Sequence, residues 1–295
     1  MIRSFEGPPA YRMIATRFGA ATVAGLLAVA LGAPGCGSSP SVAQPPVKNL
    51  PLVATNVAPM DTLGLARSRP LPPPEAAGLR LIETFPLGVA EPSDLAIDES
   101  GTVLWTVGGS PDRVYQLDLR GKIVKTLSYV GSDLEGIAYD RSDRTLWVAE
   151  ENRREIIHLD LDGGVLSRHQ LDLSGEKNSG IEGLCLDDKG HMFALNEKRP
   201  GLLLELDAGH SISARRDVRF AKDYSGIAFD PKSGDFWIVS DQSQELYLWS
   251  RQTGVALRHP LPFPKAEGVA VNDAGDRIYI VSDSENKLYV YRLTR

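Results

Sequence analysis

Short runs of alternating hydrophobic and polar residues fill the sequence from residue 78 to residue 295, and Gly, Asp and Asn separate these runs. Alternation with a period of two, bounded by turn residues, predicts β-strands joined by hairpins. Five of the runs share one pattern, in which a Ser or Glu opens an apolar stretch that ends in Asp or Asn. They are Ser93–Asp98, Glu135–Asp140, Glu182–Asp187, Ser225–Asp230 and Glu267–Asn272.

The five segments begin 42, 47, 43 and 42 residues apart. A repeat of about forty residues with several short strands is typical of a β-propeller, in which each repeat forms one four-stranded blade. The shared segment is the first strand of each repeat, and the second strand starts with large apolar or aromatic residues, such as Phe236 and Trp237. The sequence therefore predicts an all-β propeller.

The ends of the repeat region decide the number of blades. The fifth repeat ends after its third strand, Lys287–Tyr291, and an unassigned strand, Gly78–Leu87, precedes the first repeat. This unassigned strand is similar to the fourth strand of the fourth repeat, Gly254–Leu261. We expect it to complete the last blade and to close a five-bladed ring, which removes an exposed sheet edge. Six blades are the alternative, but a sixth needs about forty more residues.

The first 35 residues have the pattern of an export signal. Three arginines precede an apolar run over 18–33, which is short for a bilayer span. Cys36 follows small residues after this run, which resembles the lipobox of bacterial lipoproteins, where the cysteine is acylated. We predict a lipoprotein-type signal peptide over 1–35, lipidation of Cys36, and a membrane-anchored protein of the bacterial cell envelope, periplasm-facing or exported. Ordinary secretion with a coincidental cysteine, and a start at Met13, are the alternatives.

The composition between the signal and the repeats differs from both. Residues 36–77 contain several proline runs, and proline removes amide donors and stiffens the chain. We predict a semi-extended membrane tether here, which leaves residues 78–295 as the propeller domain.

Charge and cysteine content exclude some classes of protein. The 295 residues carry a net charge of −6, which argues against nucleic acid as a partner. Two cysteines cannot form a disulfide scaffold, and Cys185 lies in an apolar strand, where a small buried hydrophobic residue is expected. We expect a monomer. The sequence also lacks HExxH, GxSxG, Walker A and CxxC motifs.

Acidic residues recur at the positions that a propeller gathers around its channel. The start of each first strand and the end of each second strand open on the same face of the ring, next to the axis. The candidate metal-binding or ligand-binding residues at these positions are Glu135, Glu182, Glu267, Glu151, Glu197, Asp241 and Asp283.

Carboxylates gathered in this way repel one another by about 1–4 kcal/mol per pair at a surface-like dielectric. Protonation, a neighbouring Lys or Arg, or a bound cation can relieve the repulsion. Oxygen ligands without convergent His or Cys favour Ca²⁺, with Mg²⁺ as the second choice. The internal cations that could act instead are Arg153, Lys198, Arg199, Lys265 and Lys287.

A structural role is the alternative for these carboxylates, because Asp and Glu also cap strand-end amides. We expect that role for the Asp residues that end the first strands, on the opposite face: Asp98, Asp140, Asp187 and Asp230.

Residues 78–295 resemble the SdiA-regulated (YjiK-like) family of bacterial β-propeller proteins. The resemblance rests on the repeated strand starts, such as Glu135–Ala138 and Ser225–Ala228, and on the segments Val148–Asn152 and Leu195–Lys198. More distantly, the chain is similar to phytase-like esterases and calcium-dependent lactonase propellers. The family resemblance implies the fold and the compartment rather than a reaction.

Three functions fit this pattern. The first is an envelope-anchored binding protein with a Ca²⁺ site on its acidic rim, which recognises a small ligand or an envelope protein. The second is a metal-dependent hydrolase of the esterase, lactonase or glycosidase type, with Glu135, Glu182 or Glu267 as general base or nucleophile. The third is a purely structural interaction module. No single residue can be identified as catalytic from the sequence.

Overall fold

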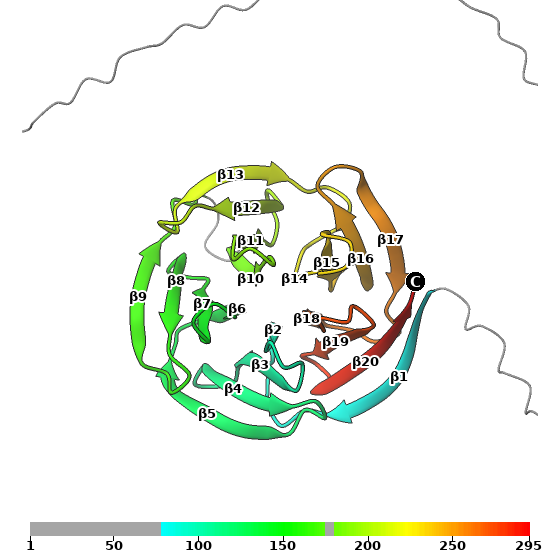
Figure 1. Ribbon diagram of the computed structural model, residues 1–295, viewed down its shortest axis with the longest axis horizontal. Coiled ribbons are helices and arrows are strands. Elements are labelled where there is room, and N and C mark those ends of the chain that lie inside the picture. The colour runs from blue at the N-terminus through cyan, green and yellow to red at the C-terminus, as the bar shows by residue number, and fades with distance from the viewer. Residues whose placement is uncertain (1–77, 175–179) are drawn as a thin grey trace, which may run out of the picture. The chain divides into compact units, whose positions relative to one another are not determined.

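The computed structural model describes residues 78–174 and 180–295, which form five four-stranded antiparallel sheets around a central axis. Figure 1 shows the sheets as the blades of a propeller, with one edge of each sheet at the axis and the other at the rim. The predicted all-β, five-bladed architecture is confirmed, and six blades are excluded. The predicted signal peptide, Cys36 and the predicted tether lie outside the described residues. Among the residues described, no helix is long and apolar enough to cross a membrane.

The strands follow one another from the axis to the rim in each blade. Blade 1 contains β2 (Leu95–Ile97), β3 (Val103–Gly108), β4 (Arg113–Asp118) and β5 (Ile123–Val130). Blade 2 contains β6 (Leu134–Asp140), β7 (Thr145–Glu150), β8 (Glu155–Leu159) and β9 (Val165–Gln170). Blade 3 contains β10 (Ile181–Leu186), β11 (Met192–Asn196), β12 (Leu202–Leu206) and β13 (Ile212–Asp217). Blade 4 contains β14 (Gly226–Phe229), β15 (Phe236–Ser240), β16 (Glu245–Ser250) and β17 (Gly254–Pro260).

Blade 5 joins the two ends of the described chain. It contains β18 (Ala266–Val271), β19 (Arg277–Ser282), β20 (Lys287–Thr294) and β1 (Gly78–Pro86). β1 pairs antiparallel with β20, from Gly78 opposite Thr294 to Pro86 opposite Lys287. The predicted closure by the N-terminal strand is therefore confirmed, and it covers an edge of β20 that would otherwise be free to pair with another chain.

The hydrophobic core lies between adjacent blades. Every residue of β7, β11 and β15 is buried, whereas most of β13 is exposed. Large side chains such as Trp237 and Phe193 are almost completely inaccessible. Burial at this level favours the folded state by about 1.5–3 kcal/mol for a large apolar side chain. The inner strands are thereby held rigidly, and their ends are fixed positions for functional side chains.

Glycine at the second position of the first strands lets neighbouring blades touch at the axis. A Cβ on Gly226 would lie 2.3 Å from the carbonyl oxygen of Glu267, and one on Gly268 would lie 2.5 Å from the carbonyl carbon of Asp94. These contacts leave no room for a side chain. The prediction that these glycines allow close packing around the axis is confirmed.

Candidate functional site

One cavity of about 420 Å³ opens at the starts of the first strands, and acidic side chains dominate its wall. We call it the acidic chamber. Six of the seven candidate residues line it: Glu135, Glu182, Glu267, Glu197, Asp241 and Asp283. Further carboxylates in the wall are Glu91, Asp112, Asp133 and Asp223. The strand starts thus converge on one space, as the repeat pattern predicts.

Glu151, the seventh candidate, is buried beside the chamber rather than in its wall. Its Oε1 accepts a hydrogen bond from the backbone N–H of Gly180 at 2.8 Å. Carboxylate oxygens of Glu151, Asp133 and Glu135 all lie within 4.8 Å of one another. Ligands of one Ca²⁺ ion lie about 2.3–2.6 Å from it, so oxygens with this spacing can share a single ion.

Burial is the main cause of unusual pKa values in the chamber. It raises the pKa of Glu135 to about 8, against a hydrogen bond from Ser93, and Asp133 and Glu151 add to the increase. It also raises the pKa of Glu151 to about 7, and a hydrogen bond to Asp133 acts in the same direction. The pKa of Glu182 is raised well above its ordinary value by burial and by the neighbouring glutamates. These groups therefore favour the protonated state when nothing else compensates their charge.

The opposite side of the chamber has its own cations. Lys265 Nζ lies 3.2 Å from Asp241 Oδ2 and 3.4 Å from Glu267 Oε1. Burial raises the pKa of Glu267 to about 7, although Lys265 acts to lower it. Lys198 forms an ion pair with Glu197. Lysine thus partly neutralises the carboxylates Glu197, Asp241 and Glu267, which belong to blades 3, 4 and 5, whereas the pKa shifts of Glu135 and Glu182 come from burial and other carboxyls.

The remaining predicted internal cations lie elsewhere. Arg153 pairs with Glu150 at 2.7 Å, and Lys287 pairs with Glu285 at 2.7 Å. Arg199 lines a separate, neighbouring cavity. The prediction of internal neutralisation is therefore confirmed for Lys198 and Lys265.

The model of the SdiA-regulated family matches residues 82–292, which is almost the whole propeller. The chain belongs to the SdiA-regulated family. The resemblance inferred from the strand starts is thereby confirmed.

Solved structures of other proteins are similar to this family member. The glutaminyl cyclase of Myxococcus xanthus has a TM-score of 0.58 and 16% identity, over 73% of this chain and 96% of that chain. The β-propeller domain of Cps50 (Swd1) from Myceliophteria thermophila has a TM-score of 0.48 and 10% identity, over 74% and 100%. A streptogramin B lyase has a TM-score of 0.45 and 18% identity, over 74% of each chain. At 16% identity the likeness to the glutaminyl cyclase extends to the fold alone.

Asp133 in the chamber wall and Asp94, which is buried at the axis, were not among the predicted candidates. Asp133 lies two residues before a predicted strand start and has a φ of 62°, a left-handed conformation that is uncommon for residues other than glycine. Asp94 occupies the strand position at which the other four repeats have glycine. It is fully buried, and its Oδ1 has no hydrogen-bond partner among the described residues. The sequence feature that could have identified Asp94 is this departure from glycine in the first repeat.

The Asp residues that end the first strands cap turns, as predicted. Asp98 Oδ1 accepts hydrogen bonds from the N–H groups of Thr102 and Val103 at 3.1 and 3.0 Å. Asp187 Oδ1 accepts them from Lys189 and His191 at 2.9 and 2.8 Å. These carboxylates belong to hairpins on the face opposite the chamber and take no part in the site.

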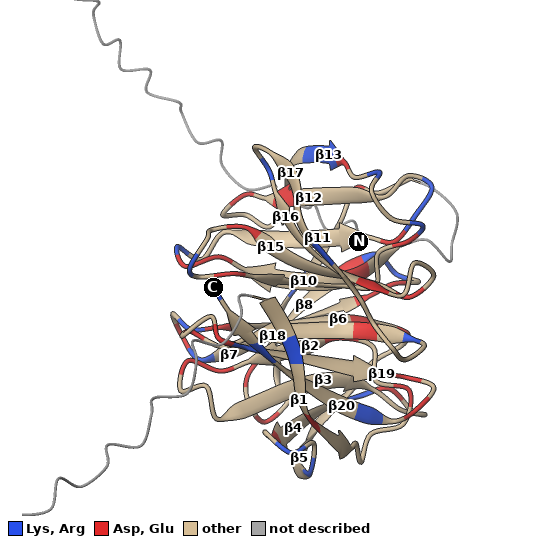
Figure 2. Cartoon of the chain, turned by 90° about the vertical axis from the view of Figure 1, so that its right-hand side faces the viewer, with Lys and Arg blue, Asp and Glu red and all other residues tan. Residues whose placement is uncertain are grey.

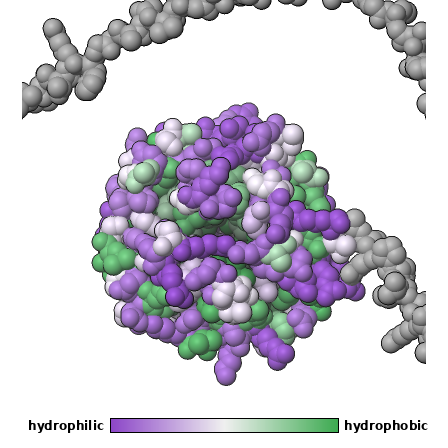
Figure 3. All heavy atoms as spheres, in the orientation of Figure 1, coloured by the Kyte–Doolittle hydropathy of each residue, from purple (hydrophilic) through white to green (hydrophobic). Residues whose placement is uncertain are grey.

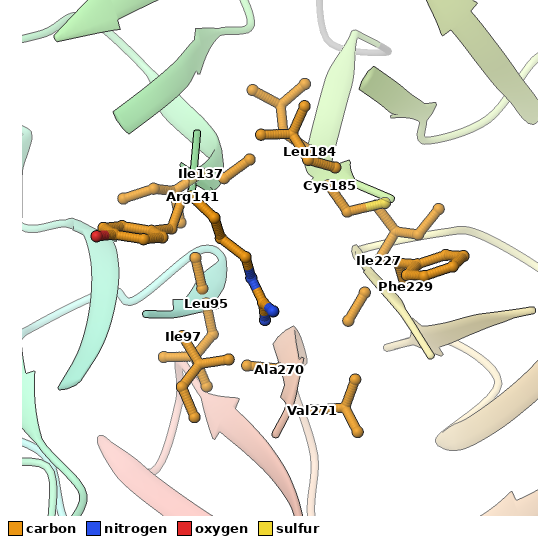
Figure 4. A pocket seen from close by; sticks show the side chains of 15 residues that line it. Leu95, Ile97, Ile137, Arg141, Leu184, Cys185, Ile227, Phe229, Ala270 and Val271 are labelled. Carbon is orange, nitrogen blue, oxygen red and sulfur yellow. The ribbon is translucent and has the colours of Figure 1, made fainter. Parts of the chain in front are cut away.

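A small cavity with mostly apolar lining residues lies towards the other end of the axis. A cavity of about 70 Å³ is lined by the later residues of the first strands, including Leu95, Ile137 and Ile227. Figure 4 shows the Arg141 side chain extending among these residues, and Arg141 forms an ion pair with Asp273. In Figure 3 hydrophobic residues are visible in the central hollow, and hydrophilic residues surround it. The carboxylates that could hold a cation are therefore gathered at one end of the axis.

Proposed function

We propose that this protein is an envelope-anchored binding protein whose acidic chamber takes up a divalent cation, Ca²⁺ first and Mg²⁺ second, together with a small ligand or an envelope partner. The observation that carries the proposal is the group of Asp133, Glu135 and Glu151, whose carboxylate oxygens lie within 4.8 Å of one another. Hard oxygen donors of this kind suit Ca²⁺ or Mg²⁺ rather than a softer transition metal.

The electrostatics of the chamber support cation binding. Glu135 and Glu182 are shifted towards the protonated state by burial and by other carboxyls. A divalent cation can replace these protons, and its direct coordination by the carboxylates offsets the free-energy cost of burying their charges. The cavity of about 420 Å³ leaves space for a ligand that completes the coordination of the ion.

Calorimetric titration of Ca²⁺ and Mg²⁺ into the purified, metal-free protein tests this proposal. We expect Ca²⁺ to bind, and Glu135→Gln to weaken it by at least about tenfold, because the variant loses one of three close carboxylates. Glu83→Gln is the matched control, since Glu83 is exposed on β1 and the substitution removes the same charge. Absence of both heat and thermal stabilisation with either ion in the wild type would contradict the proposal.

A metal-dependent hydrolase is the second candidate, and the pKa values near neutrality favour it. Glu135 has its pKa raised to about 8 and Glu151 to about 7, so both can donate and accept protons at physiological pH. Turnover of an ester, lactone or glycoside in a substrate panel, lost in Glu135→Gln and kept in Glu83→Gln, would establish this candidate. Binding of Ca²⁺ without turnover of the panel would leave the binding function.

The envelope location rests on the sequence of the first 36 residues. Acylation of Cys36 would place the propeller at the membrane surface without a spanning helix. We expect the wild type to incorporate labelled palmitate and to sediment with the membrane fraction. Cys36→Ala should lose both properties. A protein that is secreted and unlabelled would contradict the anchor but leave the chamber unaffected.

A further inference from the structure

A second cavity lies beside the acidic chamber and has the opposite charge. It measures about 450 Å³, and four cationic side chains line it together with Tyr224 and Gln242. These four are Lys198, Arg199, Arg219 and Lys222, and we call the cavity the basic pocket. No carboxylate is among its described lining residues. Lys198 and Gln242 line both cavities, so the two are direct neighbours.

The backbone around the basic pocket is held by specific contacts. The buried hydroxyl of Tyr224 accepts hydrogen bonds from the N–H groups of Phe220 and Ala221 at 3.0 and 3.2 Å. The N–H of Lys222 donates to Ser243 Oγ at 3.0 Å. Gly201 packs so closely that a Cβ there would lie 2.3 Å from the Tyr224 ring. The segment that presents Arg219 and Lys222 is therefore anchored to its neighbours at both flanks.

The cations reach the pocket from two parts of the chain. Lys198 and Arg199 follow β11, whereas Arg219 and Lys222 lie between β13 and β14. Figure 2 shows blue segments on and beside β13 and a red segment on β6. Because Lys198 and Gln242 line both cavities, the basic lining of one lies beside the acidic lining of the other.

Lys198 already pairs with Glu197, whereas the ion pair of Arg219 leaves that side chain available to a ligand. Arg219 pairs with Asp217, but 84% of the Arg219 side chain and 52% of the Asp217 side chain are exposed. An ion pair exposed to this degree contributes little to stability, so a ligand can replace it at little cost. Arginine presents a planar set of donors that matches the oxygens of phosphate or carboxylate, and lysine adds a mobile point charge.

We infer that the basic pocket binds the oxyanion of a small ligand, with phosphate as the simplest case, and that the same ligand reaches the cation in the acidic chamber through its hydroxyl or remaining anionic oxygens. The cation half of this inference rests on the proposed function, whereas the basic pocket stands without it. The ligand class is a hydroxyl-bearing organic phosphate, because it offers a dianion to four cationic side chains and neutral oxygens to a hard metal ion.

Titration of inorganic phosphate into the purified full-length protein, without divalent cations and at fixed ionic strength, tests the pocket. The double substitution Arg219→Gln with Lys222→Gln should weaken phosphate binding at least about tenfold, since two charged donors are lost. Arg215→Gln with Arg216→Gln is the control, because both residues are exposed on β13 and are not among the pocket lining. No phosphate binding by the wild type, or equal weakening by the two double variants, overturns the basic pocket.

Titration of glycerol phosphate with and without Ca²⁺ tests the link between the two cavities. Ca²⁺ should tighten glycerol phosphate binding in the wild type and not in Glu135→Gln, which keeps its affinity for inorganic phosphate. If Ca²⁺ binds but leaves glycerol phosphate affinity unchanged, the link is wrong. If phosphate binds and no divalent cation does, the proposed function fails and the basic pocket stands. If Ca²⁺ binds and phosphate does not, the basic pocket fails and the cation site of the proposed function stands.

Discussion

Asp94 in blade 1 accepts a hydrogen bond on its Oδ2 from the backbone N–H of Ile137 in blade 2, at 3.0 Å. The same oxygen accepts a second hydrogen bond from the N–H of Leu184 in blade 3, at 3.3 Å. One side chain therefore joins the first strands of three blades. Burial raises the pKa of Asp94 well above its ordinary value, so its carboxyl favours the neutral form inside the propeller.

Replacement of Asp94 by alanine should destabilise the propeller. It would leave the N–H groups of Ile137 and Leu184 buried without their acceptor, at about 1–3 kcal/mol for each group. Asp94→Asn keeps a carbonyl oxygen in the same place and should cost less than half as much. Urea unfolding measures the difference. Equal losses in the two variants would show that the side chain fills space rather than accepts these hydrogen bonds.

The pKa values in the chamber predict that the metal-free protein loses stability as pH rises. Glu135 titrates at about 8 in the folded protein against an ordinary value of 4.5, and Glu267 at about 7 against 4.5. The folded protein thus binds more protons than the unfolded chain between these values, so the free energy of unfolding falls as pH increases from about 4.5 to 8. Thermal unfolding with a chelator at pH 5, 6, 7 and 8 measures this slope.

Glu135→Gln should make that slope shallower, because the glutamine side chain carries no proton to lose in this range. Glu83→Gln, on the exposed face of β1, should leave the slope as in the wild type. A stability that rises with pH over the same window would mean that the chamber carboxyls are ionised at low pH already.

The fold could be predicted because a propeller repeats its chemistry in phase. The similarity of Gly78–Leu87 to Gly254–Leu261 was sufficient to place β1 beside β20, since both segments form the fourth strand of a blade. The same phase placed Glu135, Glu182 and Glu267 around one cavity. The position of a strand in its repeat determines its distance from the axis, and the ring arrangement brings equivalent strand ends together on one face.

The depth and the partners of each side chain could not be predicted in this way. Glu150 and Glu151 are adjacent, but Glu150 accepts a hydrogen bond from the Tyr129 hydroxyl at 2.8 Å while Glu151 contacts Asp133 near the chamber. The basic pocket combines Lys198 with Arg219, which belong to different connections of the chain. Such pairs depend on loop conformations, which the strand period does not determine.

Uptake of Ca²⁺ should release protons if the chamber is its site. Glu135, with a pKa of about 8, and Glu151, with a pKa of about 7, must lose protons before their oxygens coordinate a cation. The affinity for Ca²⁺ should therefore rise between pH 6 and pH 8. The binding heat should also vary with the ionisation enthalpy of the buffer, which calorimetry in two buffers measures. An affinity that is constant over this range would place the ion away from these two carboxyls.

Substitution of Lys265 tests whether a bound cation or the lysine ion pairs balance the charge of the chamber carboxylates. Lys265→Gln removes the charge that lies 3.2 Å from Asp241 and 3.4 Å from Glu267, and the pKa of Glu267 should rise further as a result. Without divalent cations the variant should unfold at a lower temperature than the wild type, because two partly buried carboxyls lose their partner.

The same substitution should strengthen the binding of Ca²⁺. The chamber gains one unit of negative charge, so Ca²⁺ should bind several times more tightly, and the ion should restore most of the lost stability. Lys122→Gln removes an exposed lysine from a turn outside the chamber and should change neither quantity. Thermal unfolding and calorimetry on the three proteins measure both effects. Destabilisation by Lys265→Gln that Ca²⁺ does not reverse would mean that the lysine pair, rather than an ion, is the natural counter-charge of the chamber.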